Sequence, residues 1–334
     1  MKLLRYASFP FVPLYYAVTS LRNTLYDLGL KKSTSYNFPV ICVGNLSVGG
    51  TGKTPMIEYL INLLKDDYQV ATLSRGYKRK TKGFGLADEN STAETLGDEP
   101  FQFFTKFKND IYVAVDAVRT NGIAQLRTLN KPAEIVLLDD AFQHRKVKAG
   151  FNILLTTYTK PYFNDFVLPA GNLREPRRGA KRANIIIVTK CPDNLSDIEK
   201  SSFVKRIKPE EHQHVFFSTI DYSNTLNSEG GEISINSVSN FTLVTGIANA
   251  NPLVAFLKSK NLKFEHLNYS DHYNFSEKDI KDIEKRSLII TTEKDFMRLK
   301  QYESLKDKLF YLPIKVRMDN EQLVNKLIKD FLKS

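Results

Sequence analysis

Short apolar runs rich in β-branched residues alternate with longer stretches of helical character along most of the chain. The runs are apolar throughout and lack the polar alternation of a strand with one solvated face. Strands of this kind, connected by helices, are typical of a parallel sheet covered by helices on both faces. In the first two-thirds of the chain the predicted strands occupy residues 39–43, 70–73, 111–115, 135–138, 152–155 and 185–188.

The composition becomes more polar between residues 218 and 240, where two consecutive glycines precede a short alternating segment. A second strand and helix pattern follows, and a length of 334 residues is enough for about two domains. We therefore predict a larger α/β domain at 31–218, a hinge or hairpin linker at 219–240 and a smaller α/β domain at 241–334. The smaller domain is expected to contain strands at 242–245, 263–267, 288–291 and 310–312 and a closing helix at 320–332.

The first 30 residues differ from the rest of the chain. Residues 6–21 have no formal charge, and a helix is predicted over 13–28, because Pro13 suits the first turn of a helix. This apolar stretch is too short to span a bilayer, so we interpret residues 1–30 as a helix lying in a membrane interface. A helix docked on its own domain and a cleaved signal peptide are the alternatives. The apolar stripe of the predicted helix contains Leu14, Ala17, Val18, Leu21, Leu25 and Leu28.

Composition and charge narrow the class of protein. With 42% hydrophobic and 25% charged residues, wholesale disorder is excluded. Two cysteines far apart in sequence exclude a disulfide scaffold and indicate a reducing compartment. The net charge of +11 implies an anionic partner, because the excess is concentrated in four segments: 1–30, 75–82, 145–148 and 174–182.

A glycine-rich motif follows the first predicted strand and precedes a predicted helix, which is the context of a phosphate-binding loop. The glycines allow backbone N–H groups to surround phosphates, Lys53 reaches the β and γ phosphates, and the Thr54 hydroxyl is suited to bind Mg²⁺. The motif departs from the general pattern at Ser47, where glycine is usual. We therefore predict a site for ATP formed by Ser47, Val48, Gly49, Gly50, Thr51, Gly52, Lys53 and Thr54.

A second candidate site lies at the end of the apolar strand 135–138, where Asp139 and Asp140 follow directly. A carboxylate at a strand end beside a phosphate loop is suited to hold Mg²⁺, directly or through water, although strand-end aspartates also cap helices. Two adjacent aspartates repel each other unless a cation lies nearby. We predict Thr54, Asp139, Asp140 and Gln143 as the metal shell, and His144 as a further candidate.

Six motifs occur in an order that resembles the tetraacyldisaccharide 4'-kinase family. They are GGTGKTP at 49–55, SRGY at 74–77, GDEP at 97–100, LDDAFQH at 138–144, NLREP at 172–176 and DHY at 271–273. The resemblance implies a kinase that transfers the γ-phosphoryl group of ATP to the 4'-hydroxyl of a lipid disaccharide 1-phosphate, giving lipid IVA for lipid A synthesis. It implies a peripheral protein at the cytoplasmic face of the bacterial inner membrane, which binds the membrane surface. It implies no nucleic-acid partner and no obligate protein partner.

The resemblance also implies roles for individual residues. Asp98 would be the base that accepts the proton of the acceptor hydroxyl, with His272 as its partner from the second domain. Without the resemblance, Asp98 is interpreted as a helix cap and His272 as a surface histidine. Lys53 and Arg119 are expected to stabilise the transferring phosphate. Contacts to the acceptor headgroup are expected from Arg75, Tyr77, Asn172, Arg174 and Glu175.

Two other classes of function remain as alternatives. The phosphate loop is also compatible with an ATPase or GTPase that acts as a switch or metallochaperone. The basic segments are compatible with a nucleic-acid binder, although no recognition-helix, RNP or OB-type pattern accompanies them.

Overall fold

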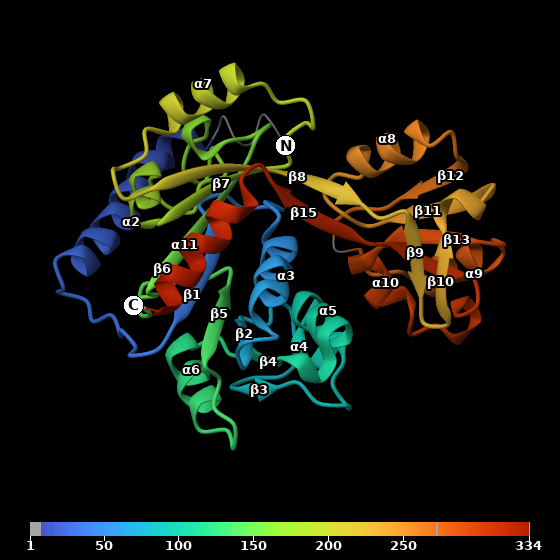
Figure 1. Ribbon diagram of the computed structural model, residues 1–334, viewed down its shortest axis with the longest axis horizontal. Helices are drawn as coiled ribbons and strands as arrows, with labels where there is room; N and C mark the ends of the chain where they lie inside the picture. Colours follow the sequence, from blue (N-terminus) through green and yellow to red (C-terminus); the bar gives the residue numbers. More distant parts are fainter. Residues whose placement is uncertain (1–7, 272, 334) are drawn as a thin grey trace.

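The computed structural model describes residues 8–271 and 273–333, and a nine-stranded sheet forms its larger part (Figure 1). The seven inner strands are parallel to one another, and the strand at each edge of the sheet is antiparallel to its neighbour. The predicted strands of the first two-thirds of the chain are confirmed. From edge to edge the order is β15 (Ile314–Met318), β8 (His214–Tyr222), β7 (Ile185–Thr189), β6 (Phe151–Thr157), β1 (Val40–Asn45), β5 (Ile135–Asp139), β2 (Val70–Ser74), β4 (Tyr112–Val115) and β3 (Gly85–Leu86).

Helices cover both faces of this sheet, which explains why its central strands are apolar throughout. One face packs against α3 (Lys53–Leu64), α5 (Asp98–Phe107) and α11 (Glu321–Lys333). The other face packs against α2 (Val12–Asp27), α6 (Arg119–Arg127) and α7 (Asp197–Ile207). Short helical turns complete this part: η1 (Phe9–Phe11), α4 (Ala93–Leu96), η2 (Lys108–Asp110), η3 (Tyr162–Asn164) and η4 (Arg177–Arg182).

A six-stranded sheet forms the smaller part, drawn in orange and red on the right of Figure 1. Helix α8 (Asn251–Ser259) packs on one face, and α9 (Glu277–Glu284) and α10 (Glu293–Leu299) pack on the other. The turns η5 (Ile235–Ser237) and η6 (Glu303–Leu305) lie between its elements. The strand order is β10 (Gly231–Ser234), β9 (Thr225–Ser228), β14 (Leu309–Leu312), β13 (Ile289–Thr292), β11 (Asn240–Thr245) and β12 (Lys263–Asn268).

The course of the chain differs from the expected boundaries at two places. The segment expected as a linker, 219–240, contains the hairpin β9–β10, which pairs with β14 and so belongs to the smaller sheet. The C-terminal part of 241–334 leaves the smaller sheet, because β15 pairs with β8 and α11 packs on the larger sheet. Alternating apolar residues predict a strand and a helix there, but they do not specify which of two sheets buries them.

Helix α2 agrees closely with the predicted range 13–28, and its polarity is reversed relative to an ordinary surface helix. The polar side chain of Asn23 is buried, with 2% exposed, and donates to the Glu175 carboxylate. The apolar side chains of Leu14, Val18 and Leu21 face outward, and Leu14 is 65% exposed. No described helix combines the length and apolar character that crossing a bilayer requires.

Candidate active site

The loop between β1 and α3 has the backbone geometry of a phosphate cradle. Gly49 has a φ of 111° and Gly52 has a φ of 90°. Residues with a Cβ atom rarely adopt these values. Ser47 does not have a positive φ, so serine is accommodated at the position where the general motif has glycine. The N-terminus of α3 follows directly and adds its N–H groups to the cradle.

Three hydrogen bonds from the ends of two strands fix the shape of this loop. The Asn45 amide donates to the Thr51 hydroxyl at 2.7 Å, and the Thr189 hydroxyl donates to the Thr51 carbonyl at 2.8 Å. The Lys190 ammonium donates to the Gly50 carbonyl at 2.8 Å. The ends of β1 and β7 therefore hold the loop in place without occupying the N–H groups of its glycines.

A second segment, 166–174, lies against the loop. The Val48 N–H donates to the Asn172 carbonyl at 2.8 Å, and the Arg174 N–H donates to the Leu46 carbonyl at 2.7 Å. The Asn172 side chain donates in turn to Asp165 at 2.8 Å. These bonds place two predicted acceptor contacts, Asn172 and Arg174, at the rim of the cradle.

The predicted aspartate pair also lies at the cradle, because β5 is the neighbour of β1 and Asp139 is in register with Val43. Asp140 has a φ of 48°, and its carboxylate lies 3.7 Å from the Lys53 ammonium. The Arg174 guanidinium binds the same carboxylate through two nitrogens, at 2.9 and 3.1 Å. Burial alone raises the pKa of Asp140, but the charges of Lys53 and Arg174 outweigh it and lower the pKa overall.

Asp139 is in the opposite electrostatic situation. Burial, followed by the neighbouring charge of Asp140, raises the pKa of Asp139 to about 6. Ser74 donates to one carboxylate oxygen at 3.2 Å, whereas the other is buried and has no partner among the residues that the structure describes. The Gln143 side-chain oxygen is also buried without such a partner. These unpartnered oxygens fit a hard divalent cation, which prefers oxygen ligands.

Glu175 occupies a different position from the one expected of an acceptor contact, since only 2% of it is exposed. Its carboxylate accepts hydrogen bonds from Asn23 at 2.6 Å, Gln143 at 2.9 Å and Arg182 at 2.7 Å. Glu175 therefore connects helix α2 to the segment that follows the aspartate pair. This arrangement indicates a positioning role for Glu175.

Asp98 is the first residue of α5 and follows the N-cap Gly97, which has a φ of 96°. Its carboxylate forms an ion pair with Arg298 from α10 of the smaller part. Arg298 is 9% exposed, and its guanidinium lies 3.7 Å from the fully buried Asp295. Asp98 therefore contacts the smaller part through Arg298. The predicted partner His272 lies outside the described residues, so their pairing stays a prediction.

Two further ion pairs join α5 and α10. The Lys294 ammonium lies 3.8 Å from Glu99, and the Lys106 ammonium lies 3.0 Å from Glu293. Lys106 also lies 2.6 Å from Glu58 of α3, the helix that begins at the phosphate loop. Burial, followed by the charge of Glu293, raises the pKa of Glu58 to about 7, although Lys106 opposes this shift. A buried charge cluster thus connects the phosphate-loop helix to the smaller part.

The remaining candidates differ in exposure. Arg75 and Tyr77 are exposed after β2, and Tyr77 is 64% exposed. Arg119 is 2% exposed and donates to the Asp116 carbonyl at 2.6 Å and the Asp139 carbonyl at 3.4 Å, so it lies directly behind the aspartate pair. Burial and nearby cations lower the pKa of His144 to about 4, so its ring is neutral at neutral pH.

Several residues that organise the site have no signal in the sequence pattern. Arg298, Lys294 and Lys106 were not predicted, because their partners lie far away in sequence. Thr292 caps α10 through Asp295, and this capping pattern is a local signal for the helix but not for its contacts. Only the tertiary structure shows that the charges of α10 face α5.

The fold and the loop together define the class: an α/β protein whose larger, mostly parallel sheet holds a glycine-rich loop of the phosphate-binding kind at its carboxyl edge. Within this class, the profile of the LpxK family, tetraacyldisaccharide-1-P 4'-kinase, matches residues 4–333. The chain belongs to this family and is a kinase.

Individual relatives agree with this assignment over almost the whole chain. A tetraacyldisaccharide 4'-kinase from Flavobacterium johnsoniae is 54% identical over 327 residues, covering 96% of this chain and 95% of the relative. One from Bacteroides thetaiotaomicron is 44% identical over 340 residues, covering 94% and 89%. A crystal structure of LpxK from Aquifex aeolicus in complex with ATP has a TM-score of 0.78 and 33% identity, covering 98% of this chain and 99% of that one.

Proposed function

We propose that the chain catalyses the reaction for which its family is named. It transfers the γ-phosphoryl group of ATP to the 4'-hydroxyl of tetraacyldisaccharide 1-phosphate, giving lipid IVA in lipid A synthesis. The observation that supports this most strongly is the glycine-lined loop with Lys53 beside the aspartate pair, in a chain that matches the family over residues 4–333.

In the proposed mechanism the loop 47–54 surrounds the triphosphate with N–H groups, and Lys53 neutralises charge on the transferring phosphoryl group. Lys53 lies 3.7 Å from Asp140, so this carboxylate holds the ammonium near the cradle before nucleotide binds. Arg119, buried behind the aspartates, adds positive potential to the same region.

The chemistry of the oxygen donors fits Mg²⁺, with Thr54, Asp139, Asp140 and Gln143 as the residues that would hold it. When bound, Mg²⁺ neutralises charge on the phosphate oxygens of ATP. The unpartnered buried oxygens of Asp139 and Gln143 support this assignment. Asp140, which is already paired with two cations, is better suited to an indirect role through water.

Asp98 acts as the base that receives the proton of the 4'-hydroxyl as the phosphoryl group arrives. Arg298 and, by family resemblance, His272 orient it from the smaller part. The ion pair between Asp98 and Arg298 supports this proposal, because it places a group from the smaller part on the candidate base. The two parts thus act as domains whose contact along α5 and α10 completes the site.

The acceptor headgroup lies against Arg75, Tyr77, Asn172 and Arg174. Exposed Arg75 and Tyr77 approach from the end of β2, and Asn172 and Arg174 approach from the rim of the cradle. Guanidinium groups are suited to the 1-phosphate, and an amide is suited to sugar hydroxyls. Glu175 acts indirectly by holding α2 and Gln143 in place.

Helix α2 places the enzyme peripherally on the cytoplasmic face of the bacterial inner membrane. Its outward Leu14, Val18 and Leu21 enter the interface, while Asn23 on its other side binds Glu175 of the larger part. Replacing Leu14 and Leu21 by glutamine is expected to weaken vesicle binding about tenfold or more, because two leucine side chains are lost from the membrane. Ile198→Gln on α7, where Ile198 is 83% exposed, is the matched control and should leave binding unchanged.

The activity is tested by transfer of radiolabelled phosphate from ATP to purified tetraacyldisaccharide 1-phosphate in detergent. The proposal expects a labelled lipid product that depends on the acceptor. Absence of this product together with rapid hydrolysis of GTP would favour a nucleotide switch instead.

A further inference from the structure

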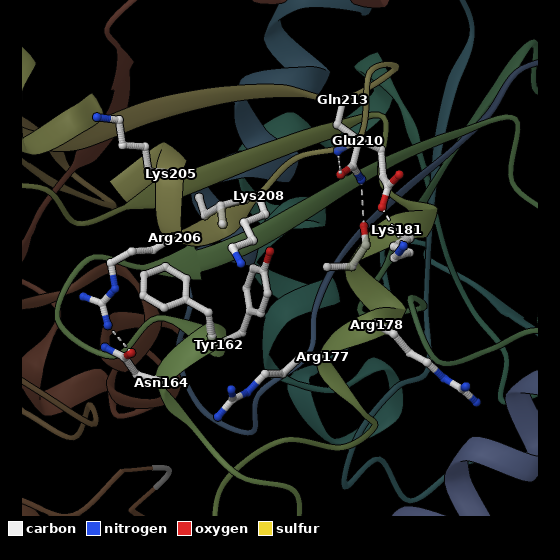
Figure 2. A pocket seen from close by; sticks show the side chains of 13 residues that line it. Tyr162, Asn164, Arg177, Arg178, Lys181, Lys205, Arg206, Lys208, Glu210 and Gln213 are labelled. Atoms are coloured by element: carbon white, nitrogen blue, oxygen red, sulfur yellow. Dashed lines mark hydrogen bonds and ion pairs between the residues drawn. The ribbon is translucent and has the colours of Figure 1, made fainter. Parts of the chain in front are cut away.

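A basic cavity lies on the larger part between η3, η4 and the end of α7 (Figure 2). Its volume is about 670 Å³. Six cationic side chains and one carboxylate line it: Arg177, Arg178, Lys181, Lys205, Arg206, Lys208 and Glu210.

Most of this positive charge has no acidic partner. Lys181 pairs with Glu210 at 2.7 Å, whereas the other five cations have no carboxylate within ion-pair distance among residues 8–271 and 273–333. Three of the five donate to uncharged oxygens instead. Arg177 donates to the Asp165 carbonyl, and Arg178 donates to the Ser20 carbonyl and the Thr24 hydroxyl. Arg206 donates to the side-chain oxygen of Asn164. Like charges gathered around one concavity repel each other unless an anion enters.

Tyr162 supplies a second and independent feature of this cavity. Tyr162 lines the cavity, and only 4% of it is exposed. The Tyr162 hydroxyl has no hydrogen-bond partner in the part of the chain that the structure describes. Tyr162 and Lys208 both line the cavity, so the lining combines a hydroxyl donor with a cation (Figure 2).

The surroundings of the cavity connect it to helix α2. A smaller cavity of about 390 Å³ shares Arg178 and Lys181 with it and reaches Asn23 and Asp27 of α2. On another side, Arg177 lies over the ring of Phe166, which contacts the ring of Phe9 edge-on at 5.8 Å. Phe166 and Phe9 are 54% and 47% exposed. The positive cavity therefore adjoins an exposed apolar surface.

We infer that the basic cavity binds the phosphate headgroup of an anionic phospholipid, which is distinct from the acceptor. The five uncompensated cations and the Tyr162 hydroxyl bind the phosphate oxygens, and the acyl chains extend along Phe166 and Phe9 toward the outward face of α2. The apolar neighbours favour a lipid over a free phosphate, which needs no such surface. The inference depends on the proposed membrane placement of α2 but not on the kinase reaction.

The test is binding of the full-length protein to vesicles that contain no acceptor. Phosphatidylcholine vesicles are compared with vesicles in which a quarter of the lipid is phosphatidylglycerol. The variant Lys205→Gln/Lys208→Gln should reduce partitioning into the anionic vesicles about tenfold and leave partitioning into neutral vesicles unchanged. Tyr162→Phe should reduce it by a smaller factor, because it removes one hydrogen bond and no charge.

The matched control is Lys326→Gln/Lys329→Gln on α11, which removes the same charge at the same spacing from outside the cavity. An equal loss with this control, or no loss with the cavity variants, would overturn the inference. Millimolar inorganic phosphate that displaces the protein completely from anionic vesicles would also overturn it, in favour of a free phosphate. Circular dichroism checks the fold of each variant, and the transfer assay in neutral detergent should be unaffected, which separates this result from a failure of the kinase proposal.

Discussion

The two sheets of the molecule have similar architecture and contribute different chemistry. Both contain parallel strands with helices on both faces, but the larger one has the glycine-lined loop and the aspartate pair at its carboxyl edge. The smaller one presents cations: Arg298 and Lys294 of α10 reach Asp98 and Glu99 at the start of α5. In the proposed function, the larger sheet binds the phosphate donor, whereas the smaller sheet orients the proposed base Asp98.

The largest expected effect is on the larger sheet. Lys53→Met should reduce phosphoryl transfer about 1,000-fold and weaken ATP binding, because it removes the charge that we propose contacts the triphosphate. Steady-state transfer and calorimetric ATP titration measure the two effects. Lys65→Met, at the opposite end of α3, is the control and should change neither.

Asp98→Ala should separate the two contributions. A base is needed for the acceptor and not for nucleotide binding, so kcat should fall about 100-fold or more with the ATP dissociation constant unchanged. Glu99→Ala, which removes the adjacent carboxylate and its contact to Lys294, should have a much smaller effect. An equal loss of turnover and ATP affinity in Asp98→Ala contradicts the base assignment.

Arg298→Met tests the smaller sheet. Loss of its ion pair removes the contact through which the smaller sheet orients the proposed base, so kcat should fall about tenfold with ATP affinity retained. Arg298→Lys should restore part of the rate, because the positive charge remains. Arg286→Met is the matched control, since Arg286 pairs with Glu265 and Asp282 inside the smaller part. If Arg286→Met and Arg298→Met reduce kcat equally, Arg298 has no special role.

The smallest effect concerns the charge cluster that joins the sheets. The pKa of Glu58 in the folded protein is raised to about 7, above its value in the unfolded chain. Protonation of Glu58 therefore favours the folded state at low pH, and this contribution is lost as pH rises through 7. Glu58→Gln has no charge to lose or gain at this position. The difference between its melting temperature and that of the wild type should therefore shift in favour of the variant by about 2 °C or more from pH 5 to pH 8. The control Glu303→Gln, in an exposed pair with Lys306, should show a constant difference across this range.

The sequence pattern predicts most of the fold and the local parts of the site. Apolar runs such as 185–188 predict buried strands, because a strand that is buried on both faces has apolar residues at every position. The loop 47–54 and the aspartate pair are local motifs, and the neighbouring position of β1 and β5 brings them together. These features follow from short stretches of sequence.

Contacts between segments far apart in sequence cannot be predicted from such local patterns. Arg298 meets Asp98 across 200 residues, and β15 returns to the larger sheet although its pattern suits either sheet. The burial of Glu175 was also not predictable, because its partners Asn23 and Arg182 come from separate elements that only the folded chain brings together. Tertiary packing decides these features.

The most direct test of the account identifies where the phosphate is placed. Purified wild-type protein and Lys53→Met are incubated with ATP, Mg²⁺ and tetraacyldisaccharide 1-phosphate, and the lipid products are analysed by mass spectrometry and phosphorus NMR. The account predicts a bisphosphorylated lipid with the new phosphate at the 4'-position for the wild type and almost none for Lys53→Met. Phosphate at another position, or equal product from both proteins, would contradict it.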